Sequence, residues 1–130
     1  MSWKTLLTAS LVVFFGCEAV AAQDEPAAAQ GDEGTIAFNN HCRNCHSFKA
    51  DDNRIGPSLH GIVGKPAGEV KGYGKYSGAL KGLTWDEATL DKFITDPQSV
   101  APGTNMAYPP VHDPAERQKI IAFLKSTSAQ

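Results

Sequence analysis

Two cysteines and a histidine lie within five residues of each other, at a spacing that can attach a metal-bearing ring. Cys42 and Cys45 are separated by two residues and His46 follows at once, which gives the pattern Cys-x-x-Cys-His. Two thiols at this spacing can add to two vinyl groups on one edge of a porphyrin, while the next side chain reaches the iron. The pattern is typical of covalent c-type haem attachment. It predicts one haem c, bound through Cys42 and Cys45, with His46 as an iron ligand.

Two other chemistries use closely spaced cysteines, namely a redox disulfide and a zinc site. A redox pair does not need the adjoining histidine. A zinc site wants four ligands, and the chain has no second cysteine pair to complete one, because its only other cysteine is Cys17. The motif therefore favours haem over both alternatives.

The first 22 residues follow the order of a secretory signal peptide. A weakly basic start precedes an apolar run from Leu6 to Phe15, and small residues come after it. We expect cleavage after Val20-Ala21-Ala22, at Ala22-Gln23, with cleavage one residue earlier as the alternative. Export by such a peptide predicts a periplasmic protein.

An uncleaved membrane anchor and a lipidated cysteine are the alternatives at this end of the chain. A membrane span needs about 20 apolar residues, and Glu18 interrupts the run too early. Gly16 suits lipidation of Cys17, but the two preceding phenylalanines do not, so we expect Cys17 to leave with the peptide. Removal of residues 1–22 takes away Lys4 and Glu18, one charge of each sign, so the net charge stays at −2. So small a charge leaves no electrostatic footprint for nucleic acid.

The rest of the chain is predicted to form one domain after a short lead-in. Residues 23–30 are rich in Ala, Pro and acidic residues without an apolar period, which is typical of a flexible segment. Residues 31–130 then form the domain. Asp32 is predicted to cap a first helix that runs to about Asn40. The apolar side of this helix would consist of Ile36, Ala37 and Phe38.

The segment from Ser47 to Gly82 is rich in glycine and proline and shows no helical period. So long an irregular stretch is unusual inside a compact domain. A haem removes the difficulty, because loops can pack on the macrocycle and use its apolar surface. We therefore expect loops around the haem here.

Two further helices are predicted after these loops. Thr84 and Glu87 have the spacing of a capping box, and Asp96-Pro97 ends that helix. Asp113-Pro114 combines an N-cap with an N1 proline at the start of the last helix, which is expected to fray from Ser126 onward. The buried faces would consist of Leu90, Phe93 and Ile94, and of Ile120, Ile121, Phe123 and Leu124. No strand-like alternation is present, so the fold class is all-α, with about three to five helices around one haem.

A second iron ligand has three candidates in the residues that follow, Met106, His60 and His112. Met106 lies in Pro102-Gly103-Thr104-Asn105-Met106, where two turn residues hold the backbone. A lone methionine usually fills a core, but this one lies in a proline-bracketed loop rather than on a helix face. The two histidines are expected at the surface.

These residues together resemble the class I cytochromes c, of the mitochondrial cytochrome c and bacterial cytochrome c2 kind. The resemblance runs from about Gly31 to Ser126. In chain order its landmarks are Gly34, Phe38, Cys42, Cys45, His46, Gly56-Pro57-Ser58-Leu59-His60-Gly61, Tyr76-Ser77, Trp85, Pro97, Pro102-Gly103-Thr104-Asn105-Met106, Ile120 and Phe123. It implies that the terminal helices cross at Gly34, Phe38, Ile120 and Phe123.

The resemblance also implies roles for individual residues around the haem. His46 and Met106 would ligate the iron. The carbonyl of Pro57 would accept the ring N–H of His46 and so select its tautomer. Tyr76 and Trp85 would hydrogen-bond a buried haem propionate, with plain core packing as the alternative role.

The chain departs from the family pattern at three places. Lys65 stands where an Arg near a propionate is common, so a bidentate contact is in doubt. Phe93 stands where many members carry a Tyr that bonds the Met sulfur. The ring around the haem edge, rich in Lys in the mitochondrial proteins, offers His41, Gln98, Asn105, His112 and Asp113. The partners are therefore expected to be less charged, or to be steered by other surfaces.

The resulting expectation is a monomeric, soluble, single-haem electron carrier of the periplasm, not an enzyme and not inserted in the membrane. Its partners would be redox proteins: a membrane cytochrome complex, an oxidase, a reaction centre or a dehydrogenase, in respiration or photosynthesis. A dedicated electron-accepting subunit of a periplasmic dehydrogenase is the alternative. A gas-binding or peroxidatic haem protein is a further alternative, but it needs an open sixth position, against which Met106 argues.

Overall fold

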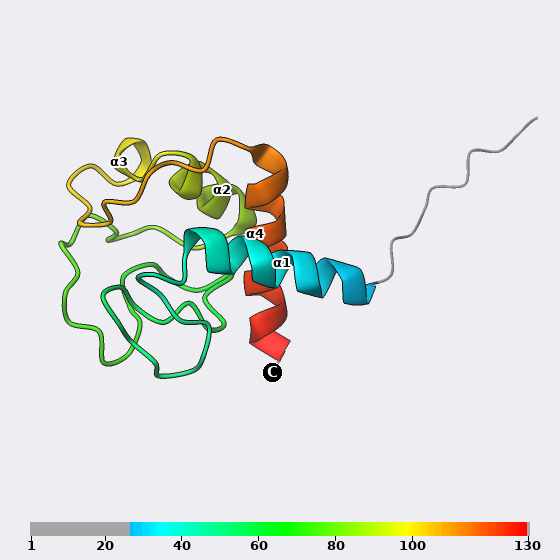
Figure 1. Cartoon of the computed structure of the whole chain (residues 1–130). Helices are drawn as coiled ribbons and strands as arrows, with labels where there is room; N and C mark the ends of the chain where they lie inside the picture. Colours follow the sequence, from blue (N-terminus) through cyan, green and yellow to red (C-terminus); the bar gives the residue numbers. More distant parts are fainter. Residues whose placement is uncertain (1–26, 130) are drawn as a thin grey trace, which may run out of the picture.

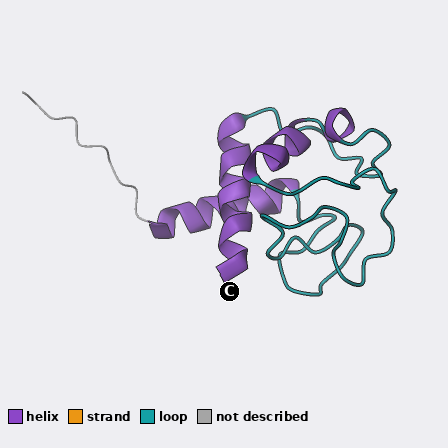
Figure 2. Cartoon of the chain, turned by 180° about the vertical axis from the view of Figure 1, so that it is seen from behind, coloured by secondary structure: helices purple, strands orange, loops and turns teal. Residues whose placement is uncertain are grey.

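The computed structural model describes residues 27–129, which form four α-helices and one 3₁₀ turn. The elements are α1 (Ala27–His41), α2 (Glu87–Thr95), α3 (Pro97–Val100), α4 (Pro114–Ser126) and η1 (Thr127–Ala129). Within these residues there is no strand, only an isolated antiparallel bridge between Pro66 and Thr84 (Figure 2). The predicted all-α class and the number of helices are confirmed. None of the helices between residues 27 and 129 is long and apolar enough to cross a membrane.

Helices α1 and α4 cross closely and close one side of the molecule (Figure 1). Gly34 permits this approach, because a Cβ atom there would lie 2.8 Å from Cβ of Phe123. Phe38 and Ile120 are fully buried beside the crossing. The ring of Phe38 packs against Phe48 and Phe123, with centroids 5.4 Å away in each case. The predicted crossing is confirmed, and Phe48 adds a loop residue to it.

The start of α1 differs from the prediction at Asp32. The helix begins at Ala27, so Asp32 lies inside it and does not cap it. Alanine has the highest helix propensity of any residue type. The run Ala27-Ala28-Ala29 therefore explains the earlier start. The last four residues of the expected lead-in are therefore helical. Ile36, expected on the buried side, is 58% exposed. The signal peptide, Cys17 and residues 23–26 lie outside the described part of the chain.

Helix α2 begins later than the capping-box pattern suggested. Its N-cap is Asp86, whose side chain accepts a hydrogen bond from the backbone N–H of Thr89 at 2.7 Å. Thr84 and Trp85 cannot join the helix, because their backbone pairs with the loop at residues 64–66. Trp85 N–H donates to the carbonyl of Lys65 at 2.9 Å, and Trp85 O accepts from Gly64 at 2.8 Å. The prediction of Thr84 as N-cap was wrong for this reason.

Helix α4 begins as predicted but ends more firmly. The carboxylate of Asp113 accepts from Ala115 N–H at 2.8 Å, and Pro114 is the first helical residue. Fraying was expected from Ser126 onward, yet Thr127 is buried and its hydroxyl oxygen accepts from Gly61 N–H at 3.0 Å. This bond joins the chain end to the loop half of the molecule.

Residues 42–86 contain no helix and fold back as loops beside the helices, as the glycine and proline pattern predicted (Figure 1). Several hydrogen bonds between distant loop residues hold this half together. Asn53 is central, since its side chain donates to Lys71 O at 3.0 Å and accepts from Ser58 N–H at 2.9 Å. The Ser58 hydroxyl in turn donates to Lys49 O at 2.6 Å. The loops thus form a shaped wall without regular secondary structure.

Candidate haem site

A cavity of about 520 Å³ lies between the helices and the loops, a size typical of cofactor sites. Most of its wall is apolar, with Ile62, Leu80, Leu90, Phe93 and Leu124 among its lining. All seven residues predicted for the site line it: Cys42, Cys45, His46, Pro57, Tyr76, Trp85 and Met106. His60 and His112 do not line it. His60 instead contacts Phe48 O at 3.2 Å, and the side chain of His112 is exposed.

His46 is held on one wall by two neighbouring loop residues. Its Nδ1 lies 2.8 Å from the carbonyl oxygen of Pro57, and because a carbonyl only accepts, Nδ1 carries the proton. Nε2 is then the nitrogen with a free lone pair. Burial lowers the pKa of His46, and the Pro57 contact partly opposes the shift, so the ring stays neutral as a metal ligand requires. Gly56 packs against the ring so closely that a Cβ atom there would overlap Cε1.

The two cysteines lie in a turn that continues directly from α1. Cys42 N–H donates to Phe38 O at 2.7 Å, and His46 N–H donates to Cys42 O at 2.9 Å. Burial, and then the neighbouring Cys45, raise the pKa of the Cys42 thiol to about 12. A redox dithiol needs a cysteine of lowered pKa. This environment therefore disfavours the redox-disulfide alternative.

The loop that carries Met106 is held at several points before the methionine. Gln98 clamps it, because its side chain donates to Thr104 O at 2.8 Å and accepts from Gly103 N–H at 3.1 Å. Asn105 donates to Lys75 O at 2.6 Å across the cavity mouth. Met106 itself is half-buried and packs against the apolar core. Gln98 and Asn105 thus brace the methionine loop, and of the two only Asn105 lines the cavity.

Arg117 braces the far end of the same loop, and the sequence reading had missed it. Its Nε donates to Asp91 Oδ1 at 2.7 Å, and its Nη1 donates to the carbonyls of Val111 and His112 at 3.0 and 2.9 Å. The side chain is only 11% exposed. The available signal was an arginine one helical turn after the Asp113 cap, which is too common a pattern to single out.

Tyr76 and Trp85 each leave a hydrogen-bond donor available near the cavity. The Tyr76 oxygen accepts from Val70 N–H at 3.3 Å, which leaves its own hydrogen free to donate. Burial raises the pKa of Tyr76, despite the Val70 contact, so the phenol stays protonated. Trp85 is buried as a residue and lines the cavity, and its indole N–H forms no hydrogen bond among residues 27–129, so this N–H is accessible from the cavity. Donors placed like this suit a carboxylate such as a haem propionate, and that role stays a prediction.

Phe93 and Lys65, two of the three departures from the family pattern, have clear structural settings. Phe93 lines the cavity and packs edge-on against Trp85, with ring centroids 4.9 Å apart. It has no polar atom to offer the Met106 sulfur. Lys65 is exposed and does not line the cavity, so the doubt about a bidentate propionate contact at this position remains justified.

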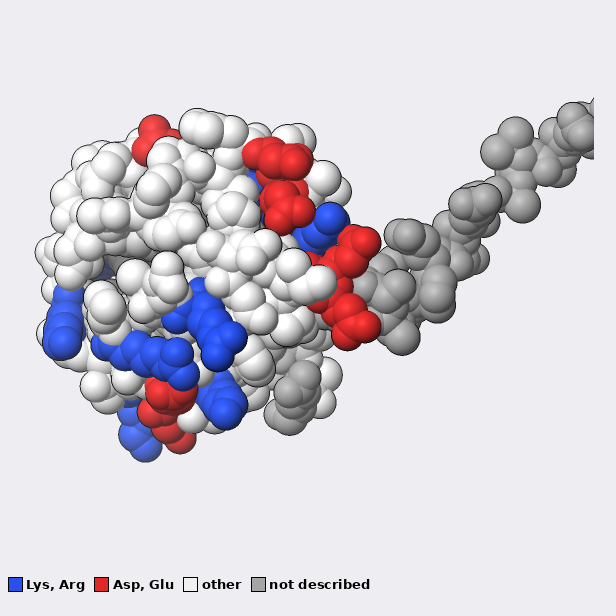
Figure 3. Space-filling model, viewed as in Figure 1, with Lys and Arg blue, Asp and Glu red and all other residues white. Residues whose placement is uncertain are grey.

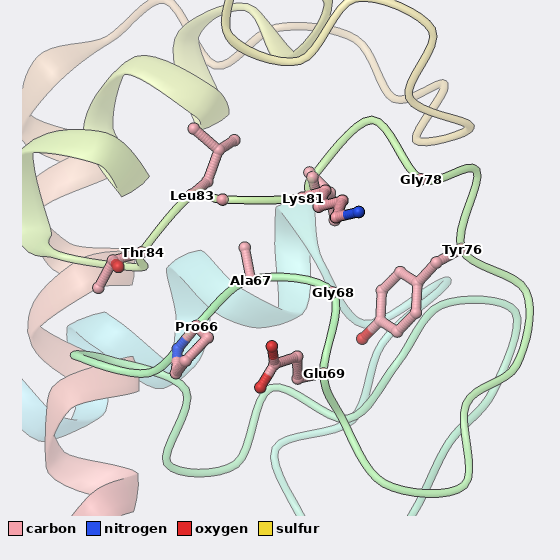
Figure 4. Close-up of a pocket in the computed structure, with 11 residues that line it drawn as sticks. Pro66, Ala67, Gly68, Glu69, Tyr76, Gly78, Lys81, Leu83 and Thr84 are labelled. Carbon is pink, nitrogen blue, oxygen red and sulfur yellow. The ribbon is translucent and has the colours of Figure 1, made fainter.

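A second hollow of about 320 Å³ lies beside the first, between two loop segments, residues 66–69 and 76–84. Figure 4 shows Tyr76 facing the segment from Ala67 to Glu69 across it. Tyr76 and Leu80 line both hollows. Tyr76 therefore separates the main cavity from the outer hollow.

The residues present fit a haem c. The cavity is apolar and roomy, two thiols lie at its edge, and an imidazole with a free Nε2 lies on its wall. Gly56 leaves space only for the flat ring of His46. Tyr76 and Trp85 add a phenol and an indole donor to the same wall, a type of group that suits an acidic substituent of the ring.

Comparison with known proteins agrees with this geometry. The sequence model of the family described as Cytochrome c matches residues 31–128. The chain is 46% identical over 87 residues to cytochrome c2 iso-2 of Magnetospirillum fulvum, covering 65% of this chain and 90% of the relative. It is 40% identical over 102 residues to cytochrome c2 of Rhodopila globiformis, covering 76% and 96%.

A solved structure shows the same likeness in three dimensions. Cytochrome cH from Methylobacterium extorquens superposes with a TM-score of 0.67 at 43% identity, covering 74% of this chain and 97% of that one. The family model's match over residues 31–128 contains the Cys-x-x-Cys-His motif, which carries one covalently bound haem c. The chain therefore belongs to the cytochrome c family of single-haem electron carriers.

Proposed function

We propose that the protein is an exported, periplasmic electron carrier whose haem iron is ligated by His46 and Met106. Its partners are other redox proteins, and it works as a monomer. The observation that carries the proposal is the presence of an imidazole and a thioether in the walls of one cavity. With both axial positions taken, no position is left for a substrate.

The chain's own residues hold this ligand pair in place. Pro57 orients the imidazole, and Gln98 and Arg117 brace the two ends of the methionine loop. The bound haem supplies a one-electron couple, which thioether ligation shifts toward the reduced state. A braced ligand set limits rearrangement when the oxidation state changes, and this favours fast electron exchange.

Periplasmic location is supported by the signal-peptide order of residues 1–22 and the presence of only two cysteines after it. Expression in a bacterium that matures c-type cytochromes tests the location. Mass spectrometry of the periplasmic fraction should find a chain that begins near Gln23 and carries the added mass of one haem. A chain that retains residues 1–22, or carries a lipid on Cys17, would contradict this part of the proposal.

Replacement of the methionine tests the ligand pair. Met106→Ala should keep the covalent haem, because Cys42 and Cys45 are untouched. It should abolish the weak near-infrared sulfur-to-iron band of the oxidised protein, lower the reduction potential and allow the reduced protein to bind carbon monoxide. His60→Ala and His112→Ala are the controls and should change none of these.

The result that would overturn the assignment is equally specific. If Met106→Ala kept the band and the potential while a histidine variant lost them, the sixth ligand would not be the methionine. If the parent protein itself bound carbon monoxide readily, the open-site alternative of a gas-binding or peroxidatic protein would replace the carrier.

A further inference from the structure

Gln98 binds the loop of Met106 with both halves of its side-chain amide. Its nitrogen donates to Thr104 O at 2.8 Å, and its oxygen accepts from Gly103 N–H at 3.1 Å. Gln98 is an exposed residue, and fixing a long polar side chain costs conformational entropy. Two bonds to one short backbone segment offset that cost. The side chain is therefore part of the loop's structure rather than of its solvated surface.

The turn at residues 101–104 leaves two backbone groups for Gln98 to bind. Thr104 N–H closes this β-turn by donating to Ala101 O at 2.9 Å. Gly103 has a φ of +85° and follows a proline, which is the pattern of a type II turn. The turn itself uses neither Gly103 N–H nor Thr104 O, and within residues 27–129 only Gln98 binds them. One carboxamide thus completes the hydrogen bonds of the turn.

Helix α3 fixes the backbone from which the Gln98 side chain reaches the turn. The carboxylate of Asp96 caps this helix by accepting from the N–H groups of Gln98 and Ser99 at 3.1 and 3.3 Å. Pro97, the first helical residue, is buried. Ala101 N–H closes the other end of the helix by donating to Pro97 O at 2.9 Å. A short, fixed helix therefore directs the amide at the turn.

The segment that carries Met106 has few hydrogen bonds of its own. Among the described residues, the backbone of residues 105–110 forms no hydrogen bond with another backbone group. Met106 N–H instead donates to the hydroxyl oxygen of Thr104 at 3.4 Å, and Thr104 is buried. Segments with few such bonds open locally at a low cost in free energy. The position of Met106 therefore depends on Thr104, whose carbonyl Gln98 holds.

The contacts of Gln98 with the loop are bonds between neutral groups. Residues 97–112 contain no Asp, Glu, Lys or Arg, and Figure 3 shows a mostly uncharged surface over α3 and the loop after it. Salt screens exposed ion pairs but does not weaken neutral hydrogen bonds in this way. The hold of Gln98 on the loop is therefore expected to be the same at low and high ionic strength.

We propose that Gln98 is the positioning residue that keeps Met106 on the iron and closes the sixth position to outside ligands. This rests on the proposed function, in which Met106 is the sixth ligand. Thioether ligation favours the reduced state, so Met106 leaves more easily in the oxidised protein. If Gln98 releases Thr104, the methionine can move away and a small basic ligand can replace it. The iron–sulfur bond breaks and an iron–nitrogen bond forms, without oxidation or reduction.

The two roles of the carboxamide can be removed one at a time. Gln98→Glu keeps an acceptor for Gly103 N–H but has no hydrogen to donate to Thr104 O, and Gln98→Lys keeps a donor but has no acceptor. Gln98→Leu removes both. The matched controls are the same three substitutions at Gln118. Gln118 is exposed on α4, and its side chain forms no hydrogen bond within the described residues.

Neutral imidazole is the probe for access to the sixth position of the oxidised holoprotein. Its binding is followed by loss of the near-infrared sulfur-to-iron band. The apparent dissociation constant depends on the fraction of open protein, so losing one hydrogen bond should lower it by about fivefold. We expect this for Gln98→Glu and Gln98→Lys, and a decrease of about tenfold or more for Gln98→Leu, at low and high salt alike. The Gln118 variants should bind imidazole as the parent does.

Amide hydrogen exchange of the reduced protein, measured by NMR, tests the same contact without an added ligand. Gly103 N–H should exchange about fivefold faster or more in Gln98→Lys and Gln98→Leu, because its acceptor is gone. The amides of Phe38 and Ile120, at the helix crossing, should keep the parent's rates. A loss of overall stability would instead raise the exchange rates at the helix crossing as well.

Three outcomes would overturn the proposal. Gln98→Leu could bind imidazole with the parent's affinity, Gly103 N–H could keep the parent's exchange rate in that variant, or Gln118→Leu could gain as much imidazole affinity. The near-infrared band of the parent separates this failure from failure of the proposed function. A parent that has the band and an unresponsive Gln98→Leu overturn only the role of Gln98. A parent without the band overturns the proposed ligand pair, and this inference with it.

Discussion

Replacement of Gly56 tests how tightly the imidazole of His46 is held. A Cβ atom at Gly56 would overlap Cε1 of His46 and lie 2.6 Å from Nδ1 and 2.8 Å from Nε2. Ordinary contacts between carbon atoms are about 3.5–4.0 Å. In Gly56→Ala the ring or the backbone must therefore move by about 1 Å.

Neither movement is free of cost. The backbone at Gly56 is held on both sides, since its N–H donates to Cys45 O at 2.8 Å and its carbonyl accepts from Arg54 N–H at 2.9 Å. The ring is held by Pro57. Overpacking costs about 1–3 kcal/mol and a lost hydrogen bond about 1 kcal/mol. The entropy that alanine removes from the unfolded chain returns only about 0.4–1 kcal/mol, so the net loss is about 1–4 kcal/mol.

Guanidinium unfolding, followed by circular dichroism, measures this loss in the haem-loaded protein. Gly74→Ala is the matched control, because a Cβ atom there meets nothing within 4 Å and its φ lies outside the left-handed region. It should change the free energy of unfolding by no more than about 0.5 kcal/mol. If Gly56→Ala unfolded at the parent's midpoint, with the parent's potential, the close packing of His46 on Gly56 would be refuted.

Three further predictions concern the helices, and denaturant unfolding tests each of them. Gly34→Ala should destabilise the fold by about 1–2 kcal/mol, because the clash with Phe123 exceeds the helix propensity gained; a more stable variant would contradict the close crossing. Asp113→Ala should cost about 1 kcal/mol as a lost N-cap, and no change would mean that α4 starts elsewhere. Asp86→Ala should lower the midpoint while Thr84→Ala leaves it unchanged, and the reverse result would restore the capping box. Hydrogen bonds from Thr89 lower the pKa of Asp86 in the folded protein. The stability lost in Asp86→Ala should therefore be largest above the usual Asp pKa. It should disappear as pH falls from that value through the lowered pKa of the folded protein.

The parts that the sequence by itself determined are those encoded by short-range chemistry. The Cys-x-x-Cys-His motif needs only five adjacent residues, and the family and its covalent haem c follow from it and its landmarks. The Asp113-Pro114 cap was predictable because a capping carboxylate bonds N–H groups two or three residues away. The loop character of the middle segment followed from its glycines and prolines for the same local reason.

Tertiary structure decided whatever depends on contacts between segments far apart in the chain. Helix α2 starts at Glu87 because Trp85 pairs with Lys65 across the loop, a contact that outweighs the capping-box pattern. Thr127 is buried because Gly61, 66 residues earlier, supplies its partner. One part of the cavity lining likewise forms only when Ile55, Tyr73 and Lys75 meet there, with the Tyr73 hydroxyl donating to Ile55 O. Periodicity and capping rules describe neighbours within about one helical turn. They therefore cannot predict which distant backbone group or side chain forms such a contact.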